Sequence, residues 1–288
     1  MNIVYIGSSG PLSTIPLQTL INSKFNISAV AVDSNKNDTI PNINKNSDSL
    51  ASLAFYNNVP LIKLTKKVAS NVAAIKKYQP DIILVSCYAR KIPNEIAQLA
   101  KVGCFNIHPS LLPNYRGPTP LFWQFKKGEE NFGVTLHRVT KKFDQGNIIA
   151  QQTIKMPDGI SKAEASILLA KLAGKIILKT MPLLQNGDFK DVKQDETIAS
   201  YQSYFKKEDY VVSVNWTAKR LYNFIAAHKR TMITFPCEID GKVYELSDVV
   251  SYQANAYNGL NEDMYCITDN VISFKCADGY IQCVFKNA

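Results

Sequence analysis

Two polar side chains stand two positions apart at the end of an apolar run. The run covers residues 102–108 and contains Asn106 and His108. The two-residue period of a strand puts both side chains on one face, and Pro109 and Pro113 then prevent further regular pairing. An amide beside an imidazole at the end of a strand is suited to hydrogen-bond donation and proton transfer. Taken alone, the pattern fits a catalytic pair and a purely structural pair equally well, the latter being an Asn and a His that hydrogen-bond to the backbone of the loop.

A carboxylate that suits this pair follows at Asp144, in the stretch 142–148 and shortly before a glycine. An isolated Asp-x-Gly is usually a turn former. From such a turn, however, the Asp144 carboxylate would reach His108, select its tautomer and favour its protonated form. Asn106, His108 and Asp144 are therefore the candidate catalytic residues.

These side chains need a framework, and residues 1–110 predict one. Apolar β-rich runs alternate there with stretches of helical periodicity. The expected strands cover residues 2–7, 27–33, 60–63, 81–86 and 102–108, and the expected helices cover 13–23, 47–57, 68–78 and 93–99. This alternation is typical of an α/β fold with a mostly parallel sheet, whose ligand sites lie beyond the carboxyl ends of the strands. Residues 33–49, rich in Asn and Ser, predict a mobile loop.

The rest of the chain predicts further strands over 133–139 and 148–154 and a long amphipathic helix over 162–184, with Pro182 near its end. We expect a catalytic domain over residues 1–188, a linker over 189–210 and a smaller domain over 211–288. In the smaller domain Thr217 would cap a helix over 219–228. Residues 235–285 contain short β-rich segments separated by turns, which indicates a β-rich, barrel-like domain.

The composition excludes several classes of protein. A hydrophobic share of 46% is ordinary for a globular chain, and no apolar run is long enough for a membrane span. The first residues lack the charged start of a signal peptide, and the six cysteines form no CxxC pair. We therefore expect a cytoplasmic protein with no membrane association. Neither a GxGxxG nor a Walker A pattern is present, which disfavours dinucleotide and ATP sites.

The charge balance suggests a polyanionic partner, because 33 basic and 24 acidic side chains give a net charge of +9. The distribution weakens that interpretation. Residues 1–188 contain 22 basic and 11 acidic side chains, whereas residues 189–288 contain 11 basic and 13 acidic ones. Lysine supplies 28 of the basic side chains, although recognition surfaces favour arginine. The excess is only weak support for a nucleic-acid partner.

The stretches FNIHPSLLPNYRG, GVTLHRV and FDQGNIIAQ resemble the 10-formyltetrahydrofolate-dependent formyltransferases. The resemblance is to the branch that contains methionyl-tRNA formyltransferase and the amino-sugar N-formyltransferases. It covers residues 1–285, and the three motifs keep the order and spacing of the family. It implies a Rossmann-like N-terminal formyltransferase domain, N10-formyltetrahydrofolate as the formyl donor, and catalytic positions for Asn106, His108 and Asp144.

The resemblance also implies two binding regions. The folate would lie against residues 86–93 and 142–147, much of it held by backbone groups. The residues expected to bind the folate are Ser86, Cys87, Tyr88, Ala89, Arg90, Ile92, Lys142, Phe143, Gln145 and Gly146. The residues expected on the acceptor side are Ser110, Leu111, Leu112, Pro113, Tyr115, Arg116 and Gly117.

Formyl transfer suits the three catalytic residue types. When an amine attacks the formyl carbon, negative charge develops on the formyl oxygen. The Asn106 amide and a protonated His108 would stabilise it, each donor contributing about 3–4 kcal/mol. Either His108 or a water held by Asp144 would take the amine proton. The sequence contains no His, Cys and Asp cluster with zinc spacing, so we expect no metal.

Three departures from the tRNA enzymes bear on the acceptor. Residues 33–49 carry only Lys36 and Lys45 where a basic insertion is typical. Residues 228–236 replace a Pro-Trp-Pro-like segment, and no basic tail follows near residue 288. These departures favour a small amine acceptor, most plausibly a nucleotide-linked amino sugar, over methionyl-tRNA.

Other interpretations stay open. A folate-binding relative without activity is one, although the three catalytic residue types are intact. Glycinamide ribonucleotide transformylation is another, but those enzymes generally lack the C-terminal region. Phe122 and Phe125 have helical spacing that suits core packing, and His137 is expected to be a packed histidine rather than a catalytic one. A homodimer is possible.

Overall fold

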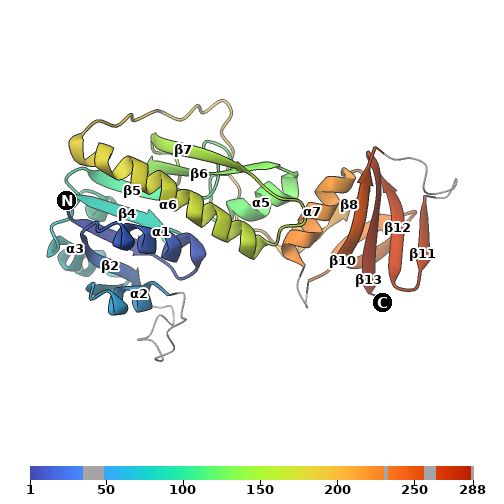
Figure 1. Ribbon diagram of the computed structural model, residues 1–288, viewed down its shortest axis with the longest axis horizontal. Coiled ribbons are helices and arrows are strands. Elements are labelled where there is room, and N and C mark those ends of the chain that lie inside the picture. Colours follow the sequence, from blue (N-terminus) through green and yellow to red (C-terminus); the bar gives the residue numbers. More distant parts are fainter. Residues whose placement is uncertain (35–48, 230–232, 256–263, 287–288) are drawn as a thin grey trace. The chain divides into compact units, whose positions relative to one another are not determined.

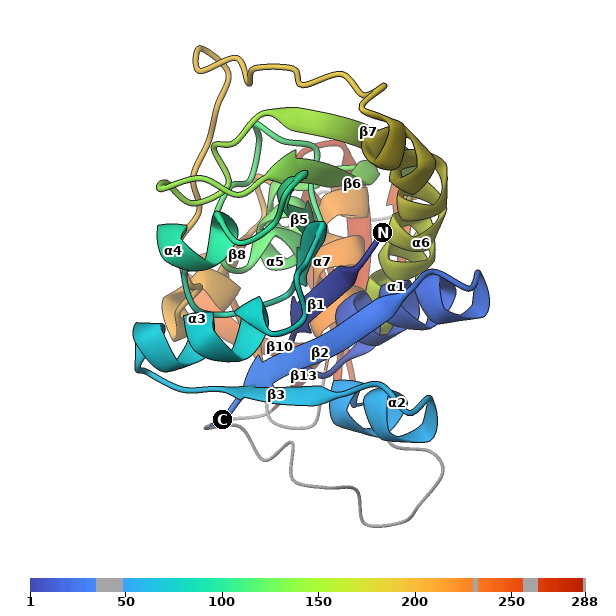
Figure 2. The same cartoon turned by 90° about the vertical axis from the view of Figure 1, so that its left-hand side faces the viewer.

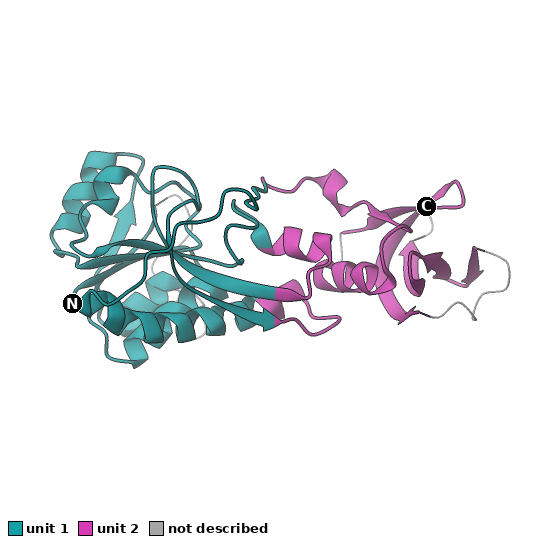
Figure 3. Ribbon diagram, turned by 90° about the horizontal axis from the view of Figure 1, so that it is seen from above, with its two compact units in different colours: residues 1–120, 132–154, 166–202 teal, residues 121–131, 155–165, 203–288 magenta. Residues whose placement is uncertain are grey.

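The computed structural model describes residues 1–34, 49–229, 233–255 and 264–286. The predicted loop over 33–49, with Lys36 and Lys45, therefore lies almost entirely outside the described residues. The chain forms two compact units (Figure 3). Unit 1 comprises Met1–Pro120, Phe132–Ile154 and Ser166–Gln202, and unit 2 comprises Leu121–Asn131, Lys155–Ala165 and Ser203–Ala288. The domain boundaries at 188 and 210 stay a prediction.

Unit 1 is built on a seven-stranded sheet with the order β3-β2-β1-β4-β5-β6-β7. The first five strands pair in parallel, and β6 runs antiparallel to β5. The strands are β1 (Ile3–Gly7), β2 (Ile27–Asp33), β3 (Leu61–Leu64), β4 (Ile82–Ser86), β5 (Gly103–His108), β6 (Asn131–Arg138) and β7 (Ile148–Lys155). The mostly parallel, Rossmann-like sheet predicted from the alternating pattern is confirmed (Figure 1).

Helices cover both faces of this sheet. They are α1 (Pro11–Asn22), α2 (Leu50–Tyr56), α3 (Val68–Lys76), α4 (Asn94–Ala97) and α6 (Lys162–Asn186). Figure 2 shows α1 and α6 on one side and α3 and α4 on the other. Every residue of β1 and β4 is buried, because a parallel strand between two helical layers has no face left for water. This explains why these strands are continuous apolar runs in the sequence.

The strand order reverses between β1 and β4, and this is where ligands bind in open α/β sheets. The carboxyl end of β4 is hydrogen-bonded to the first turn of α1, which follows β1. The Ser13 hydroxyl donates to the Ser86 carbonyl oxygen at 2.6 Å, and the Ser86 hydroxyl donates to the Leu12 carbonyl oxygen at 2.6 Å. A Cβ atom on Gly7 would lie 2.8 Å from the Ser86 carbonyl oxygen, so only glycine fits there. Strand β5 lies next to β4, which puts its end beside this point.

Unit 2 contains most of α5 (Pro120–Lys127), a short 3-10 helix η1 (Lys207–Tyr210), α7 (Ala218–His228) and a second sheet. That sheet has the order β11-β12-β13-β10-β9-β8 and is antiparallel apart from the β8–β9 pair. Its strands are β8 (Val212–Ser213), β9 (Phe235–Ile239), β10 (Lys242–Ala254), β11 (Tyr265–Thr268), β12 (Val271–Cys276) and β13 (Gly279–Lys286). The predicted β-rich C-terminal region is confirmed.

Helix α7 packs against β10 and supplies the core of unit 2. Its N-terminus is capped as predicted, because the Thr217 side chain accepts from the Arg220 N–H. Phe122 and Phe125 of α5 are buried, as their spacing predicted, and the Phe122 ring stacks on Phe205 with centroids 4.2 Å apart. Among the described residues, no helix is long and apolar enough to cross a membrane.

Candidate active site

The antiparallel pairing of β5 and β6 gathers four polar side chains on one face of the sheet. Asn106 stands opposite His137, and His108 stands opposite Thr135. Directly opposed residues in an antiparallel pair point to the same side, and the two-residue period joins the two pairs along each strand. The site is thus founded on strands rather than on loops alone.

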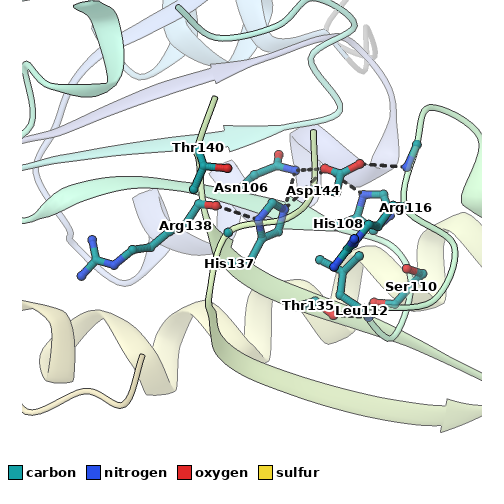
Figure 4. A network of polar contacts seen from close by, with 12 residues as sticks. Asn106, His108, Ser110, Leu112, Arg116, Thr135, His137, Arg138, Thr140 and Asp144 are labelled. Atoms are coloured by element: carbon teal, nitrogen blue, oxygen red, sulfur yellow. Dashed lines mark hydrogen bonds and ion pairs between the residues drawn. The ribbon is translucent and has the colours of Figure 1, made fainter. Parts of the chain in front are cut away.

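Asp144 brings three of these side chains, Asn106, His108 and His137, into one network (Figure 4). Its Oδ1 atom lies 3.5 Å from Asn106 Nδ2, 3.7 Å from His108 Nδ1 and 3.6 Å from His137 Nε2. Its Oδ2 atom accepts from the Gly117 N–H at 2.9 Å. The three residues proposed from the sequence therefore lie together, with the carboxylate at their centre.

His137 belongs to this network, although the sequence analysis expected only a packed side chain. It is buried, and its Nδ1–H donates to the Arg138 carbonyl oxygen at 2.9 Å. Its Nε2 atom lies 3.1 Å from Asn106 Nδ2. The available signal was the antiparallel pairing of the GVTLHRV stretch with the strand of Asn106, which a local pattern does not reveal.

The protonation state of His108 differs from the expectation. Burial lowers the pKa of His108, and this effect outweighs the Asp144 charge and the Tyr115 carbonyl oxygen, which both raise it. The imidazole is therefore neutral at pH 7, although Asp144 favours the protonated form as the sequence analysis expected. Its Nε2–H donates to the Tyr115 carbonyl oxygen at 2.9 Å, which leaves the Nδ1 lone pair on the Asp144 side.

Asp144 itself is ionised. Burial raises the pKa of its carboxyl, but the charge that His108 gains at acid pH, the His137 contacts and the Gly117 N–H together hold it well below its ordinary value. Its backbone lies in the left-handed region, with φ at +53°. Such a conformation is unfavourable for a residue other than glycine and persists where the surroundings enforce it.

The predicted acceptor-side loop is anchored to β6 and β7. The Thr135 hydroxyl donates to the Ser110 carbonyl oxygen at 2.7 Å and accepts from the Leu112 N–H at 3.1 Å. Gln151 Nε2 donates to the Leu112 carbonyl oxygen at 2.6 Å. Pro113 is buried. The Leu111 side chain lies against Gly133, and a Cβ atom on Gly133 would be only 2.3 Å from Leu111 Cδ2. This part of the loop is structural support for the site.

Arg116, also predicted on the acceptor side, is used within the chain. Its side chain is 4% exposed. Its guanidinium donates to Gln194 Oε1 from Nε at 3.0 Å and from Nη2 at 2.8 Å. It also donates to both carboxylate oxygens of Glu196, at 2.9 and 2.8 Å. The neighbouring Tyr115 is half-buried, with φ at +59°.

The predicted folate residues after β4 fall into two groups. Ser86 and Ile92 are buried, and Arg90 is held by Asp33 at 2.9 Å and by the carbonyl oxygens of Leu64 and Thr65. These three stabilise the ends of the strands. Cys87 and Ala89 are exposed and Tyr88 is half-buried, so this short stretch is what the carboxyl edge offers to a ligand.

The second predicted folate segment precedes β7. Lys142 and Phe143 are exposed and Gln145 is half-buried. Gly146 is buried, and a Cβ atom there would lie 1.8 Å from the Arg138 carbonyl oxygen. This glycine therefore permits the close approach of the Asp144 loop to the end of β6. Within the described part of the chain, no group of three His, Cys, Asp or Glu residues is placed to hold a metal ion.

Known proteins share this architecture. Residues 1–181 match the family described as Formyl transferase. Methionyl-tRNA formyltransferase from Thermotoga maritima is 30% identical over 236 residues, which cover 79% of this chain and 72% of that protein. The solved N-formyltransferase from Helicobacter canadensis, in complex with folinic acid and dTDP-3-aminofucose, has a TM-score of 0.73 at 20% identity, over 99% of each chain. WlaRD, a sugar 3N-formyl transferase, has a TM-score of 0.70 at 22% identity, over 100% of this chain and 98% of that one. With the family match over more than half of its length, the chain belongs to the formyl transferase family.

Proposed function

We propose that this protein transfers a formyl group from N10-formyltetrahydrofolate to the primary amine of a small acceptor, a nucleotide-linked amino sugar. Family membership supports formyl transfer, and the cluster of Asn106, His108 and Asp144 supports an active enzyme over a folate-binding relative without activity. The observation that carries the choice of acceptor is the charge balance of residues 189–288, which contain 11 basic and 13 acidic side chains.

Each catalytic side chain has a role that follows from its contacts. Asn106 is half-buried, and the Nδ2 hydrogen that makes only a long contact with Asp144 Oδ1, at 3.5 Å, would donate to the oxygen on which charge develops, for about 3–4 kcal/mol. Neutral His108 takes the amine proton at Nδ1 and then returns it to N10 of the folate as the bond from N10 to the formyl carbon breaks, so that tetrahydrofolate leaves. The imidazolium between these two steps has an acceptor at each nitrogen, the Tyr115 carbonyl oxygen at Nε2 and Asp144 Oδ1 at Nδ1. The ionised Asp144 stabilises that charge.

The folate supplies the activated formyl carbon. The residues that fit it are the exposed Cys87 and Ala89 with the half-buried Tyr88, which follow the strand next to β5, and Phe143, whose side chain is 51% exposed beside Asp144. Backbone groups and an exposed aromatic ring suit a flat heterocycle. We propose that residues 1–188 carry this chemistry.

Three lysines of unit 2 are paired with carboxylates. Lys126 lies 3.1 Å from Asp209, and Lys229 lies 3.1 Å from Asp248. Lys219 contacts both Glu130, at 2.8 Å, and Asp158, at 3.4 Å. Binding of tRNA depends on cations that neutralise phosphates, and cations already paired with carboxylates are poor at this. These pairs, together with the acidic balance of residues 189–288, favour an acceptor other than tRNA.

A competition assay tests the acceptor. The full chain is supplied with N10-formyltetrahydrofolate and either nucleotide-linked 3- and 4-amino sugars or charged initiator methionyl-tRNA. Tetrahydrofolate release and the mass of the acceptor are followed. We expect formylation of a sugar. Formylation of the tRNA with every sugar inactive would overturn the proposed acceptor while retaining formyl transfer.

Methionyl-tRNA is the second candidate, because the Thermotoga maritima relative that matches 79% of this chain is named for it. The homodimer also stays a prediction, and the molar mass of the protein in solution tests it.

A further inference from the structure

Gln194 lies in the segment between α6 and η1, yet its side chain reaches the catalytic network. It is 4% exposed. Its Nε2 group donates to the Asp144 carbonyl oxygen at 2.7 Å and to the Gly146 carbonyl oxygen at 2.7 Å. Both donors of the amide are thereby directed at the backbone that carries the catalytic carboxylate.

The other end of the amide faces Arg116. Gln194 Oε1 accepts from Arg116 Nε and Nη2, at 3.0 and 2.8 Å. The orientation of the amide is determined by its surroundings, since carbonyl oxygens require the NH₂ group on one side and a guanidinium requires the oxygen on the other. All hydrogen-bonding positions of this buried amide are used.

These bonds join the two loops that hold Asp144. One loop carries Asp144 itself, with its left-handed backbone. The other carries Arg116 and Gly117, and the Gly117 N–H holds Asp144 Oδ2 at 2.9 Å. We infer that Gln194 is a positioning residue for the transfer reaction: its amide keeps the Asp144 backbone where the carboxylate faces His108 and Asn106. This inference rests on the proposed function.

The segment around Gln194 has other anchors, so a change at Gln194 leaves it in place. The Arg116 N–H donates to the Ser200 carbonyl oxygen at 3.0 Å, and the Gln202 N–H donates to the Arg116 carbonyl oxygen at 2.8 Å. The Tyr115 N–H donates to Ser200 Oγ at 2.9 Å. These bonds do not involve the Gln194 side chain.

Gln194→Glu isolates the amide N–H groups. The variant keeps the shape of the side chain and its oxygen toward Arg116, and it removes the donation to the Asp144 and Gly146 carbonyl oxygens. Glu196→Gln is the matched control, because the Glu196 side chain is 59% exposed and is bonded to Arg116. The double variant exchanges the two groups and restores the charge around Arg116.

Misplacement of a catalytic group by about 1 Å costs about 100-fold in rate, and we expect Gln194→Glu to lower kcat by about that factor. Glu196→Gln should stay within about twofold of the wild type, as exposed substitutions do. The double variant should be as slow as Gln194→Glu. Recovery of kcat in the double variant would show that charge at Arg116 was responsible and would overturn the inference.

Hydrogen exchange of the Gly117 amide gives a readout that needs no substrate. When Asp144 moves, the Gly117 N–H loses its acceptor, so the Gly117 amide should exchange faster in Gln194→Glu than in the wild type. In Glu196→Gln its exchange rate should be unchanged. Equal Gly117 exchange in Gln194→Glu and the wild type overturns the positioning role. Failure of the wild type to formylate any acceptor would instead refute the proposed function, and the exchange measurement would still decide the role of Gln194.

Discussion

At the scale of single residues, two acceptors surround His108. The Tyr115 carbonyl oxygen lies 2.9 Å from Nε2, and Asp144 Oδ1 lies 3.7 Å from Nδ1. Both favour the charged imidazole, but burial favours the neutral one and is the larger effect. The free protein therefore holds a neutral base next to groups that stabilise its protonated form. This arrangement lets the side chain gain a proton during the reaction.

The pH dependence of kcat/KM tests this assignment. The active form of His108 is neutral, so activity is lost as the pH falls through its pKa. Because burial places the pKa below its ordinary value of 6.5, we expect a constant kcat/KM at neutral pH and a decline only below about 6.5. A decline that begins above pH 7 would contradict a neutral, buried base.

Removal of the catalytic side chains tests their roles directly. His108→Ala and Asp144→Ala should each lower kcat by about 10²–10⁴-fold, the usual contribution of general acid–base catalysis. Folding should be largely retained, which thermal unfolding followed by circular dichroism will check. A His108→Ala variant that is folded and turns over at the wild-type rate would refute the mechanism.

At the scale of elements, strands β5 and β6 hold the side chains and loops close over them. The closure depends on backbone positions without space for a side chain. At Gly117, φ is +113° and a Cβ atom would lie 2.1 Å from the Gln202 carbonyl oxygen. Gly187, which follows α6, also has a positive φ, +79°, but a Cβ atom on Gly187 would have no other atom within 4 Å among the described residues.

These two glycines form a matched pair for mutation. Gly187→Ala should cost about 1 kcal/mol of the free energy of unfolding, from backbone strain alone. Gly117→Ala adds a clash and should cost about 3 kcal/mol, with a fall in kcat because its N–H holds Asp144. Denaturant unfolding measures both costs. Equal losses for the two variants would show that the close approach at Gly117 has no energetic consequence.

Helix α7 ends in a histidine that is buried among aromatic rings. The His228 ring centroid lies 4.8 Å from that of Phe224 and 5.0 Å from that of Phe122. Its Nδ1 lies 2.9 Å from the Phe224 carbonyl oxygen, and its Nε2 has no hydrogen-bond partner among the described residues. Burial lowers the pKa of His228 to about 4.

This burial predicts an acid-sensitive unit 2. The unfolded chain binds a proton at His228 below pH 6.5, whereas the folded chain does so only near pH 4. Stability is therefore lost as the pH falls between these values, by about 3 kcal/mol in total. In His228→Phe this loss should be absent, so the unfolding free energies of the variant and the wild type should diverge from pH 7 to pH 4. Parallel curves would contradict the burial of a neutral histidine.

At the scale of the whole molecule, the net charge of +9 is unevenly distributed along the chain. The C-terminal residues 189–288 carry more acidic than basic side chains, and basic groups of unit 2 such as Lys126, Lys219 and Lys229 are paired with carboxylates. A large net charge thus coexists with a C-terminal region that carries a slight acidic excess.

Salt dependence separates the two acceptors. Proteins that make several phosphate contacts lose about 10³–10⁵-fold in affinity between 50 and 200 mM salt. For the formyl acceptor of this enzyme we expect KM to change by less than about tenfold over that range, because a small acceptor brings few charges. Measurement of KM for the active acceptor at both salt concentrations checks this, and a much steeper dependence would indicate a nucleic acid.

Much of the fold follows from local patterns. The alternation of strands and helices in unit 1, the cap at Thr217 and the strands of unit 2 depend on periodicity and turn chemistry over a few neighbouring residues. The placement of the Asn106 and His108 side chains on one face of their strand is also a local property, because it follows from the two-residue period of the strand. Asp144 was found through spacing and family resemblance rather than through geometry.

Only the tertiary structure decided the rest of the site. The antiparallel register of β5 and β6 puts His137 opposite Asn106, and folding brings Gln194 to Asp144 across 50 positions of sequence. The sign of the pKa shift of His108 depends on how completely the fold buries it. The sequence by itself determined which chemical groups are available and which strand face carries two of them, because those are local properties. Strand register, long-range hydrogen bonds and desolvation all depend on contacts between segments that are distant in the sequence. Those contacts therefore determined how the groups act together.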